Sequence, residues 1–153
     1  MAANLSAENA ERQNTAADAV ATHYALQYSK YNIPFSFKLD LPTILPIPKI
    51  DLCLTLSNLL ENALEASLKT DSAKRHILVQ AYLHSDRMIL LTVENIFDGN
   101  ITAKNGEYQS SKRSGCGIGL QSVRHIAEKS GGYSRFLYEN GTFCANIILR
   151  AEK

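Results

Sequence analysis

The stretch that decides the fold is LCLTLSNLLENALEAS, residues 52–67, a leucine-rich run in which Asn58 and Asn62 are four positions apart. Positions i and i+4 lie on one face of a helix. At about 100° per residue, the polar residues of this region fall within a stripe roughly 80° wide, and leucine and alanine cover most of the remaining surface. The stripe consists of Asp51, Thr55, Asn58, Asn62, Glu65 and Lys69. The pattern predicts a largely buried helix with one narrow polar line.

The asparagine pair has two interpretations at this point. Asparagine is a mediocre helix former, and lysine or glutamate suits a solvated helix face better. The pair is therefore either a plain solvent-facing stripe or a pair of amides that point into a polar site. A motif further along the chain is needed to decide between them.

Composition limits the class of protein. The chain has 153 residues, of which 45% are hydrophobic and 20% charged, and a net charge of +1. These values predict one globular domain over residues 1–153 and argue against a nucleic-acid surface. No apolar run reaches the roughly 20 residues of a membrane span, and no secretory signal is present. Cys53, Cys116 and Cys144 lack metal-site spacing, so we expect a reducing cytoplasm rather than a disulfide framework or a zinc site.

Helical and strand periodicities alternate along the chain. The predicted elements are a helix over about 9–31, a strand over 35–39, the asparagine helix, strands over 77–83 and 88–93, a helix over 115–132, and strands over 133–138 and 142–149. Asn140-Gly141 is a strong hairpin-turn signal between the last two strands. The order predicts an α+β fold with three helices on one face of a mixed, largely antiparallel sheet of about five strands.

A glycine motif, Gly115-Cys-Gly117-Ile-Gly119-Leu120, follows a polar segment over 94–114 that has no periodicity. Such long loops are usually lids or binding loops. Glycine lets the backbone approach a ligand, and the start of the following helix suits phosphate. The alternative is a flexible hinge with a tight turn. The motif is neither a Walker A loop, because Gly-Lys-Ser/Thr is missing, nor a dinucleotide fingerprint, because no strand precedes it.

Three segments together resemble the GHKL superfamily, the ATP-binding domain shared by gyrase, Hsp90, sensor histidine kinases and mismatch-repair ATPases. NLLENALEAS at 58–67 resembles its asparagine box, and GCGIGLQSVRHIAEKSGG at 115–132 resembles its glycine-rich lid end. VENIFDG at 93–99 resembles the adenine-contact box of the peptide-sensing, quorum-type histidine kinases. The resemblance covers roughly residues 14–150. It implies a Bergerat-type two-layer sandwich with a core over 33–150 and an ATP lid over 96–116.

The resemblance implies ATP and Mg²⁺ as cofactors. Asn62 matches the asparagine that holds Mg²⁺, an ion that prefers hard oxygen ligands. Asn58 matches the position at which hydrolysing members carry a glutamate, and an asparagine cannot act as a general base. Both are expected to be catalytic and to bind nucleotide, with Asn62 as the metal ligand. The other expected nucleotide contacts are Asn95, Phe97, Lys112, Arg113, Gly115, Gly117, Ile118, Gly119 and Leu120.

The chain departs from the family pattern at two positions. Asn95 stands where most members have an aspartate that bonds the adenine amino group, and an amide oxygen accepts the same bond without charge assistance. Glu65 stands where many kinases have a cation, and it is expected to repel phosphate unless Mg²⁺ or a lid cation intervenes. Lys104, Lys112 and Arg113 are the lid candidates for that cation, and simple solvation is the alternative role for each.

The resemblance therefore implies the ATP-binding catalytic domain of a two-component sensor histidine kinase, which passes the γ-phosphoryl group to a histidine on a separate domain. Expected partners are ATP, that histidine-bearing dimerisation domain and a response regulator, without nucleic acid or direct membrane contact. His23 and His125 are interpreted as structural or surface residues, so the chain is expected to be a C-terminal, cytoplasmic fragment of a membrane-bound sensor. The alternatives are a non-catalytic ATP-binding regulatory module, an anti-sigma-type serine kinase and an ATP-hydrolysing clamp.

Overall fold

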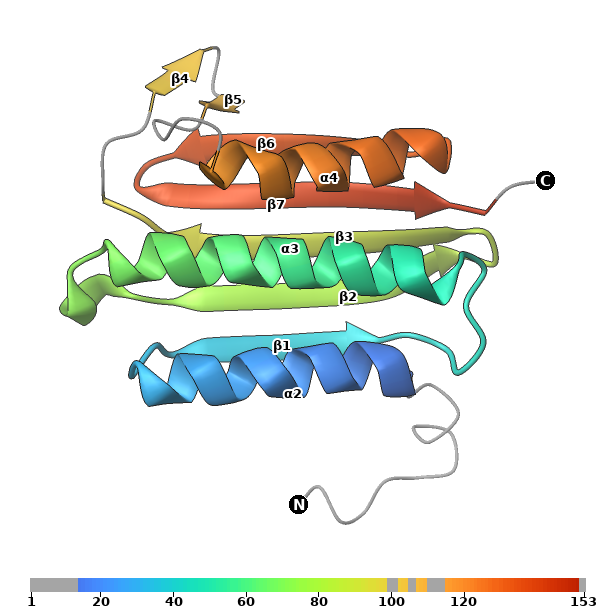
Figure 1. The fold of residues 1–153 in the computed structure, drawn as a ribbon, viewed down its shortest axis with the longest axis horizontal. Coiled ribbons are helices and arrows are strands. Elements are labelled where there is room, and N and C mark those ends of the chain that lie inside the picture. Colours follow the sequence, from blue (N-terminus) through green and yellow to red (C-terminus); the bar gives the residue numbers. More distant parts are fainter. Residues whose placement is uncertain (1–13, 99–101, 105–106, 110–114, 152–153) are drawn as a thin grey trace.

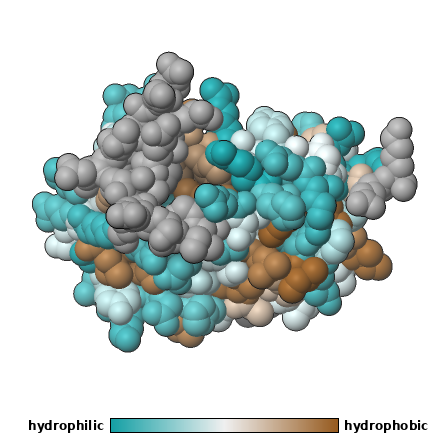
Figure 2. Space-filling model, turned by 45° about the horizontal axis from the view of Figure 1, so that its top comes forward, coloured by the Kyte–Doolittle hydropathy of each residue, from teal (hydrophilic) through white to brown (hydrophobic). Residues whose placement is uncertain are grey.

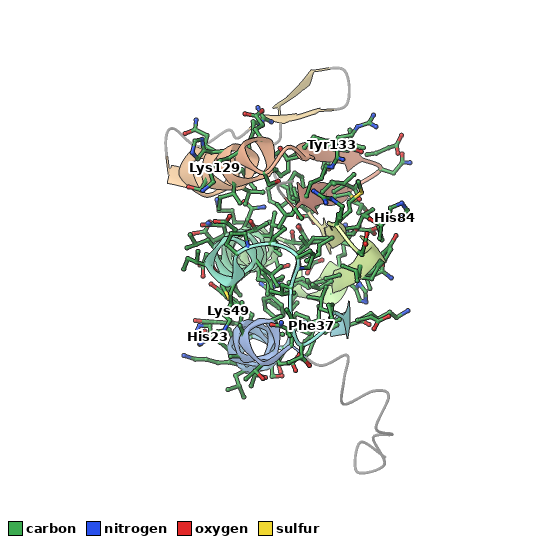
Figure 3. The ribbon with its side chains drawn as sticks, turned by 90° about the vertical axis from the view of Figure 1, so that its right-hand side faces the viewer. His23, Phe37, Lys49, His84, Lys129 and Tyr133 are labelled. Carbon is green, nitrogen blue, oxygen red and sulfur yellow. The ribbon has the colours of Figure 1, made fainter. Side chains whose placement is uncertain are left out.

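The computed structural model describes residues 14–98, 102–104, 107–109 and 115–151, with the backbone alone for 102–104, 107–109 and 115–118. Three helices, α2 (Thr15–Lys30), α3 (Lys49–Leu68) and α4 (Gly115–Lys129), cover one face of a sheet (Figure 1). Side chains such as His84 and Tyr133 lie on the opposite, open face (Figure 3). This arrangement confirms the predicted two-layer α+β architecture.

The sheet has five long strands and two short ones. Its order is β1-β2-β3-β7-β6-β5-β4, and only β1 and β2 pair in parallel. The long strands are β1 (Phe35–Asp40), β2 (Ile77–Ser85), β3 (Met88–Ile96), β6 (Tyr133–Glu139) and β7 (Thr142–Arg150). The short ones, β4 (Thr102–Lys104) and β5 (Glu107–Gln109), form a hairpin within the segment predicted to lack structure. The dipeptide Asn105-Gly106 is the sequence signal for this hairpin.

The leucine-rich helix α3 lies at the centre of the helical layer and supplies much of the core. Its leucine face is buried as predicted, with Leu52, Leu56 and Leu60 fully enclosed. The start of its polar stripe is buried as well, because α4 packs over it. Thr55 is fully buried, and Asp51 pairs with Lys129 of α4 at 3.9 Å. The start of the stripe therefore faces a neighbouring helix, whereas Lys69 at its other end is exposed.

Helix α2 packs on α3 through alanine and tyrosine. Asn14 caps the helix, since its side chain accepts from the Ala17 amide at 3.0 Å. Ala17, Ala21, Tyr24 and Tyr28 are buried, whereas Tyr31 is exposed. The Tyr28 hydroxyl donates to the Leu60 carbonyl at 2.8 Å, so a buried polar atom is satisfied across the helix pair. The predicted first residues of the helix, 9–13, lie outside the described residues.

Because of Tyr24, the stability of this helix pair depends on pH in the alkaline range. Burial raises the pKa of Tyr24 from 10.0 to about 12, and the hydrogen bond to Glu61 and the charges of Glu61 and Glu65 add to the effect. A phenol with a raised pKa stabilises the fold fully below its unfolded pKa and loses that contribution as pH rises through the folded value. We expect the free energy of unfolding, measured in urea, to fall between pH 10 and about 12. Tyr24→Phe should reduce the slope, and an unchanged slope would contradict the assignment.

Two glycine-bearing turns connect the last three elements. Gly131 has φ +87° and ends α4, and the Gly132 amide donates to the Ala127 carbonyl at 2.9 Å. Asn140 (φ 52°) and Gly141 (φ 77°) form the β6–β7 turn. The β6–β7 turn confirms the sequence prediction, and the Gly131 turn ends α4 at Lys129, three residues before the predicted end.

The surface in Figure 2 is largely hydrophilic, with apolar residues gathered at the lower right of the view. At this end of the molecule lie the 41–48 segment and the start of α3 (Figure 1). Exposed apolar side chains there are Ile44, Ile50 and Leu54. Within the described part of the chain, no helix has the length and apolar character to cross a membrane.

Candidate functional site

Asn58, the first residue of the asparagine pair of α3, faces the beginning of α4. The Asn58 Oδ1 atom lies so close to Gly119 that a Cβ on this glycine would be 3.4 Å from it. The Asn58 Nδ2 group donates to the Leu54 carbonyl at 2.9 Å, which leaves the oxygen directed toward α4. Asn62 follows one turn later, is half-buried, and has no hydrogen-bond partner among the described residues. The Asn58 oxygen therefore faces the beginning of α4, and Asn62 offers a second amide on the same face of α3.

Asn95 contributes a second polar group, at the end of β3. Its position in the register, between Ile77 of β2 and Phe143 of β7, places its side chain on the helix-covered face, and the residue is only 2% exposed. Its Nδ2 group makes a long bond to the Ile96 carbonyl at 3.4 Å, and its Oδ1 atom has no partner in the described structure. A buried unpaired acceptor costs about 1–3 kcal/mol. An acceptor that persists at this cost indicates a place for a ligand donor.

The end of α3 is tied to the end of β3 by residues that the sequence analysis did not single out. Thr70 Oγ1 bonds the Ala66 carbonyl at 3.0 Å and the Ile96 carbonyl at 3.3 Å. One turn earlier, the Ser67 hydroxyl is fully buried without a partner among the described residues. Serine and threonine near a helix end are usually capping residues, so only the tertiary arrangement assigns them to the site.

The three motif glycines lie inside α4 rather than in a loop ahead of it. The helix begins at Gly115, so Gly117 and Gly119 occupy its first turns. A glycine within a helix costs about 1 kcal/mol relative to alanine. The spacing of 3.4 Å to Asn58 is ordinary van der Waals contact, so the described neighbours of Gly119 leave room for a methyl group. Packing against these neighbours does not explain the glycine, whereas close approach of a ligand to the backbone does.

Comparison with known families identifies the domain. A family model described as GHKL domain matches residues 47–150, which include α3, β3, the β4–β5 hairpin and α4. The chain belongs to the GHKL domain family. No curated protein sequence matches it.

Solved structures share the fold of this GHKL domain. The catalytic domain of histidine kinase ThkA has a TM-score of 0.68 at 19% identity, with 88% of this chain and 90% of that chain covered. Mycobacterial sensor histidine kinase MprB has a TM-score of 0.61 at 18% identity, with coverages of 88% and 93%. Acinetobacter baumannii histidine kinase AdeS has a TM-score of 0.67 at 13% identity, with coverages of 90% and 64%. At these identities the similarity shows a common fold.

The predicted site residues of the GHKL domain are distributed over several elements. Asn58 and Gly119 lie against each other between α3 and α4. Asn62 lies one turn further along α3, and Asn95 lies at the end of β3. Phe97 is 8% exposed and is held by its backbone, whose N–H donates to the Gly141 carbonyl at 2.9 Å and whose carbonyl accepts from the Tyr138 hydroxyl at 3.0 Å. Leu120 packs into the core at 7% exposed. Residues outside the described part, wholly or in their side chains, are Lys104, Lys112, Arg113 and Ile118.

Removing the Asn95 side-chain amide is expected to raise the stability of the free domain and to weaken ATP binding. Asn95→Leu removes the unpaired oxygen, so we expect the free domain to unfold about 2–4 °C higher for each kcal/mol recovered. The same change should weaken ATP binding at least about tenfold, the equivalent of roughly 1.4 kcal/mol. Asn95→Asp, which keeps the acceptor, is the matched control and should retain binding. A thermal unfolding scan measures the change in unfolding temperature, and calorimetric titration with ATP measures the affinity. Unchanged affinity in Asn95→Leu would remove this residue from the site.

Proposed function

We propose that this GHKL domain is the ATP-binding catalytic domain of a sensor histidine kinase, which positions Mg-ATP for γ-phosphoryl transfer to a histidine on a separate domain. The observation that carries the proposal is the pairing of two polar groups within this fold. One is the buried, unpaired Asn95 oxygen at the end of β3, and the other is the Asn58 amide, whose oxygen faces Gly119.

The Asn95 end of the site suits adenine. The amino group of adenine is a hydrogen-bond donor, and the Asn95 Oδ1 atom is an acceptor without a donor among the described residues. Ser67 supplies a second buried polar atom at the adjacent end of α3. Since the acceptor is an amide and not a carboxylate, the bond is neutral and weaker than a charge-assisted one. The buried position of Phe97 fits the apolar character of a purine ring.

The asparagine end suits phosphate and metal. Asn62, which has no competing bond, would ligate Mg²⁺ through its amide oxygen, with phosphate and water as the other ligands. When bound, the ion neutralises charge on the transferring group. The amides at the start of α4 would hold phosphate oxygens, and the glycines would keep this approach open. Lys112 and Arg113 are proposed to add positive charge from the lid.

Asn58 favours transfer over hydrolysis. An amide at this position cannot remove a proton from water, so the residues of this site orient ATP without activating a water nucleophile. The accepting histidine would come from a dimerisation domain, and a response regulator would receive the group next. His23 and His125 are exposed on α2 and α4, as expected for surface residues.

A phosphotransfer assay tests the proposal. The domain is mixed with a dimeric histidine-bearing domain, Mg²⁺ and ATP labelled at the γ-position, and the product is analysed for phosphohistidine. We expect acid-labile phosphohistidine, with little free phosphate when the acceptor is omitted. Phosphoserine on a partner would indicate a serine kinase of the same fold. Nucleotide binding without transfer would indicate a regulatory module, and steady phosphate release by the domain alone would indicate a hydrolysing clamp.

A further inference from the structure

The strand β1 forms one edge of the sheet, far from the nucleotide site in strand order, and a groove runs between it and α2. Within the described residues β1 pairs only with β2. The groove has a volume of about 510 Å³ and is lined by Asp18, Ala21, Thr22, Ala25, Phe37 and Leu39. Phe37 lies between α2 and β1 in Figure 3 and stacks on Tyr28 of α2 at 6.2 Å. The groove thus has a helix on one side and a free strand edge on the other.

The backbone of this edge is left with unpaired groups. The Ile77 amide donates to the Pro34 carbonyl at 3.0 Å, and Phe35 is in register with Ile77. In a parallel pair, this bond directs every second residue of β1 toward β2 and the others away from it. The N–H and C=O groups of Phe37 and Leu39 therefore point outward, and they meet no partner among the residues that the structure describes. A row of such groups is a template for another strand.

A second cavity lies beside the same strand on the open face of the sheet. It has a volume of about 440 Å³ and is lined by Lys38, Leu39, Asp40, Gln80, Ala81 and Tyr82. Tyr82 is 43% exposed, which leaves a large ring for a partner to cover. Successive side chains of a strand point to opposite faces of its sheet. A strand laid against β1 would therefore direct alternate side chains toward the α2 groove and toward the Tyr82 cavity.

We propose that β1 binds an extended peptide segment of a partner protein as an added strand. Main-chain bonds to Phe37 and Leu39 would give affinity, and the two cavities would select the side chains. The walls formed by Ala21 and Ala25 suit medium apolar side chains, such as valine or isoleucine, on the helix side. The exposed carboxylate of Asp18 favours a basic residue beside them, and Tyr82 favours an aromatic residue on the open side.

The geometry favours a foreign peptide over a second copy of this chain. Pairing of β1 with its own copy would set the two strands about 4.8 Å apart and place both α2 helices on the same face. A helix with its side chains is about 10 Å wide, and α2 already borders the groove at this edge. The two helices would compete for the same space. A short extended peptide has no such helix.

Amide hydrogen exchange, followed by NMR, tests the proposal with the blocked peptide KVTVYVTK as the probe. Its valines would face α2 and its tyrosine the open side. At about ten times Kd, we expect exchange at Phe37 and Leu39 to slow about tenfold, while Lys38, already bonded to β2, changes little. Unchanged exchange at Phe37 and Leu39 would overturn the proposal. Slow exchange at these two amides in the free domain would also overturn the proposal, because another segment would already cover the edge. That segment would be either residues 1–13 or a second copy of the chain. Only a second copy would be lost on dilution.

Two matched pairs of changes distinguish strand addition from non-specific binding of the peptide. In the peptide, N-methyl groups are placed either on the three valines or on the residues between them, so that one set blocks the edge facing β1. Loss of protection with one set alone supports the proposal, and the same result with both sets contradicts it. In the protein, Thr22→Arg should fill the groove and weaken binding at least tenfold. His23→Arg, on the side of the same helix that faces away from β1 (Figure 3), should leave binding unchanged, and equal effects of the two would contradict the site.

Discussion

Replacing Asn62 by alanine is expected to lower the rate of phosphoryl transfer about 100-fold or more, because a misplaced metal forfeits several kcal/mol of charge neutralisation. The free domain should keep its stability, since the Asn62 side chain is half-buried and bonds no other described residue. The effect should therefore appear in turnover and in Mg²⁺ dependence, and not in the melting temperature of the free domain.

Ser57→Ala is the control for this change. Ser57 lies on the solvent side of α3, and its hydroxyl bonds only the Leu54 carbonyl of its own helix, at 3.3 Å. The Ser57→Ala variant should transfer the phosphoryl group at the wild-type rate. If Asn62→Ala transferred phosphate at the wild-type rate and with the same Mg²⁺ requirement, the metal ligand would have to be another residue.

Gly132→Ala should have the largest effect on stability. A Cβ at this position would lie 1.8 Å from the Ile148 carbonyl oxygen, a backbone atom that cannot rotate away. Relief requires α4 and β7 to separate, so we expect a loss of about 3 kcal/mol or more in the free energy of unfolding. Urea unfolding measures the difference.

Gly131→Ala separates this clash from ordinary glycine strain. Gly131 has a positive φ of +87° but has open space around its Cβ position. Its substitution should cost only about 1–2 kcal/mol, the price of a left-handed conformation. Equal losses in the two variants would show that contact with Ile148 is relieved more easily than the structure indicates.

The sequence predicted the elements of this domain well, because their signals are local. The leucine pattern of α3, the alternation in β2 and the Asn140-Gly141 turn each lie within one short segment. The asparagine pair and the glycine motif likewise indicated a site before their contact was known. Their meeting at Gly119 and Asn58 adds the geometry that two separate motifs cannot provide.

What the sequence could not predict depends on pairing between distant segments. The unpaired state of the Asn95 oxygen follows from the register of β3 with β2 and β7 and from the burial beneath α3. Ser67 and Thr70 join the site only because α3 ends over the last residues of β3. The free edge of β1 similarly requires knowledge that β1 pairs in parallel with β2 and with no other described strand.

The central claim is that this domain binds Mg-ATP between α3, the end of β3 and α4. The claim is most directly tested by thermal unfolding with and without Mg-ATP. A ligand at 100 times its Kd stabilises by about 2.7 kcal/mol, which corresponds to roughly 5–10 °C for a domain of this size. We predict a shift of this magnitude for the wild-type domain and its loss in Asn62→Ala. A melting temperature that saturating Mg-ATP leaves unchanged in the wild-type domain would contradict the account.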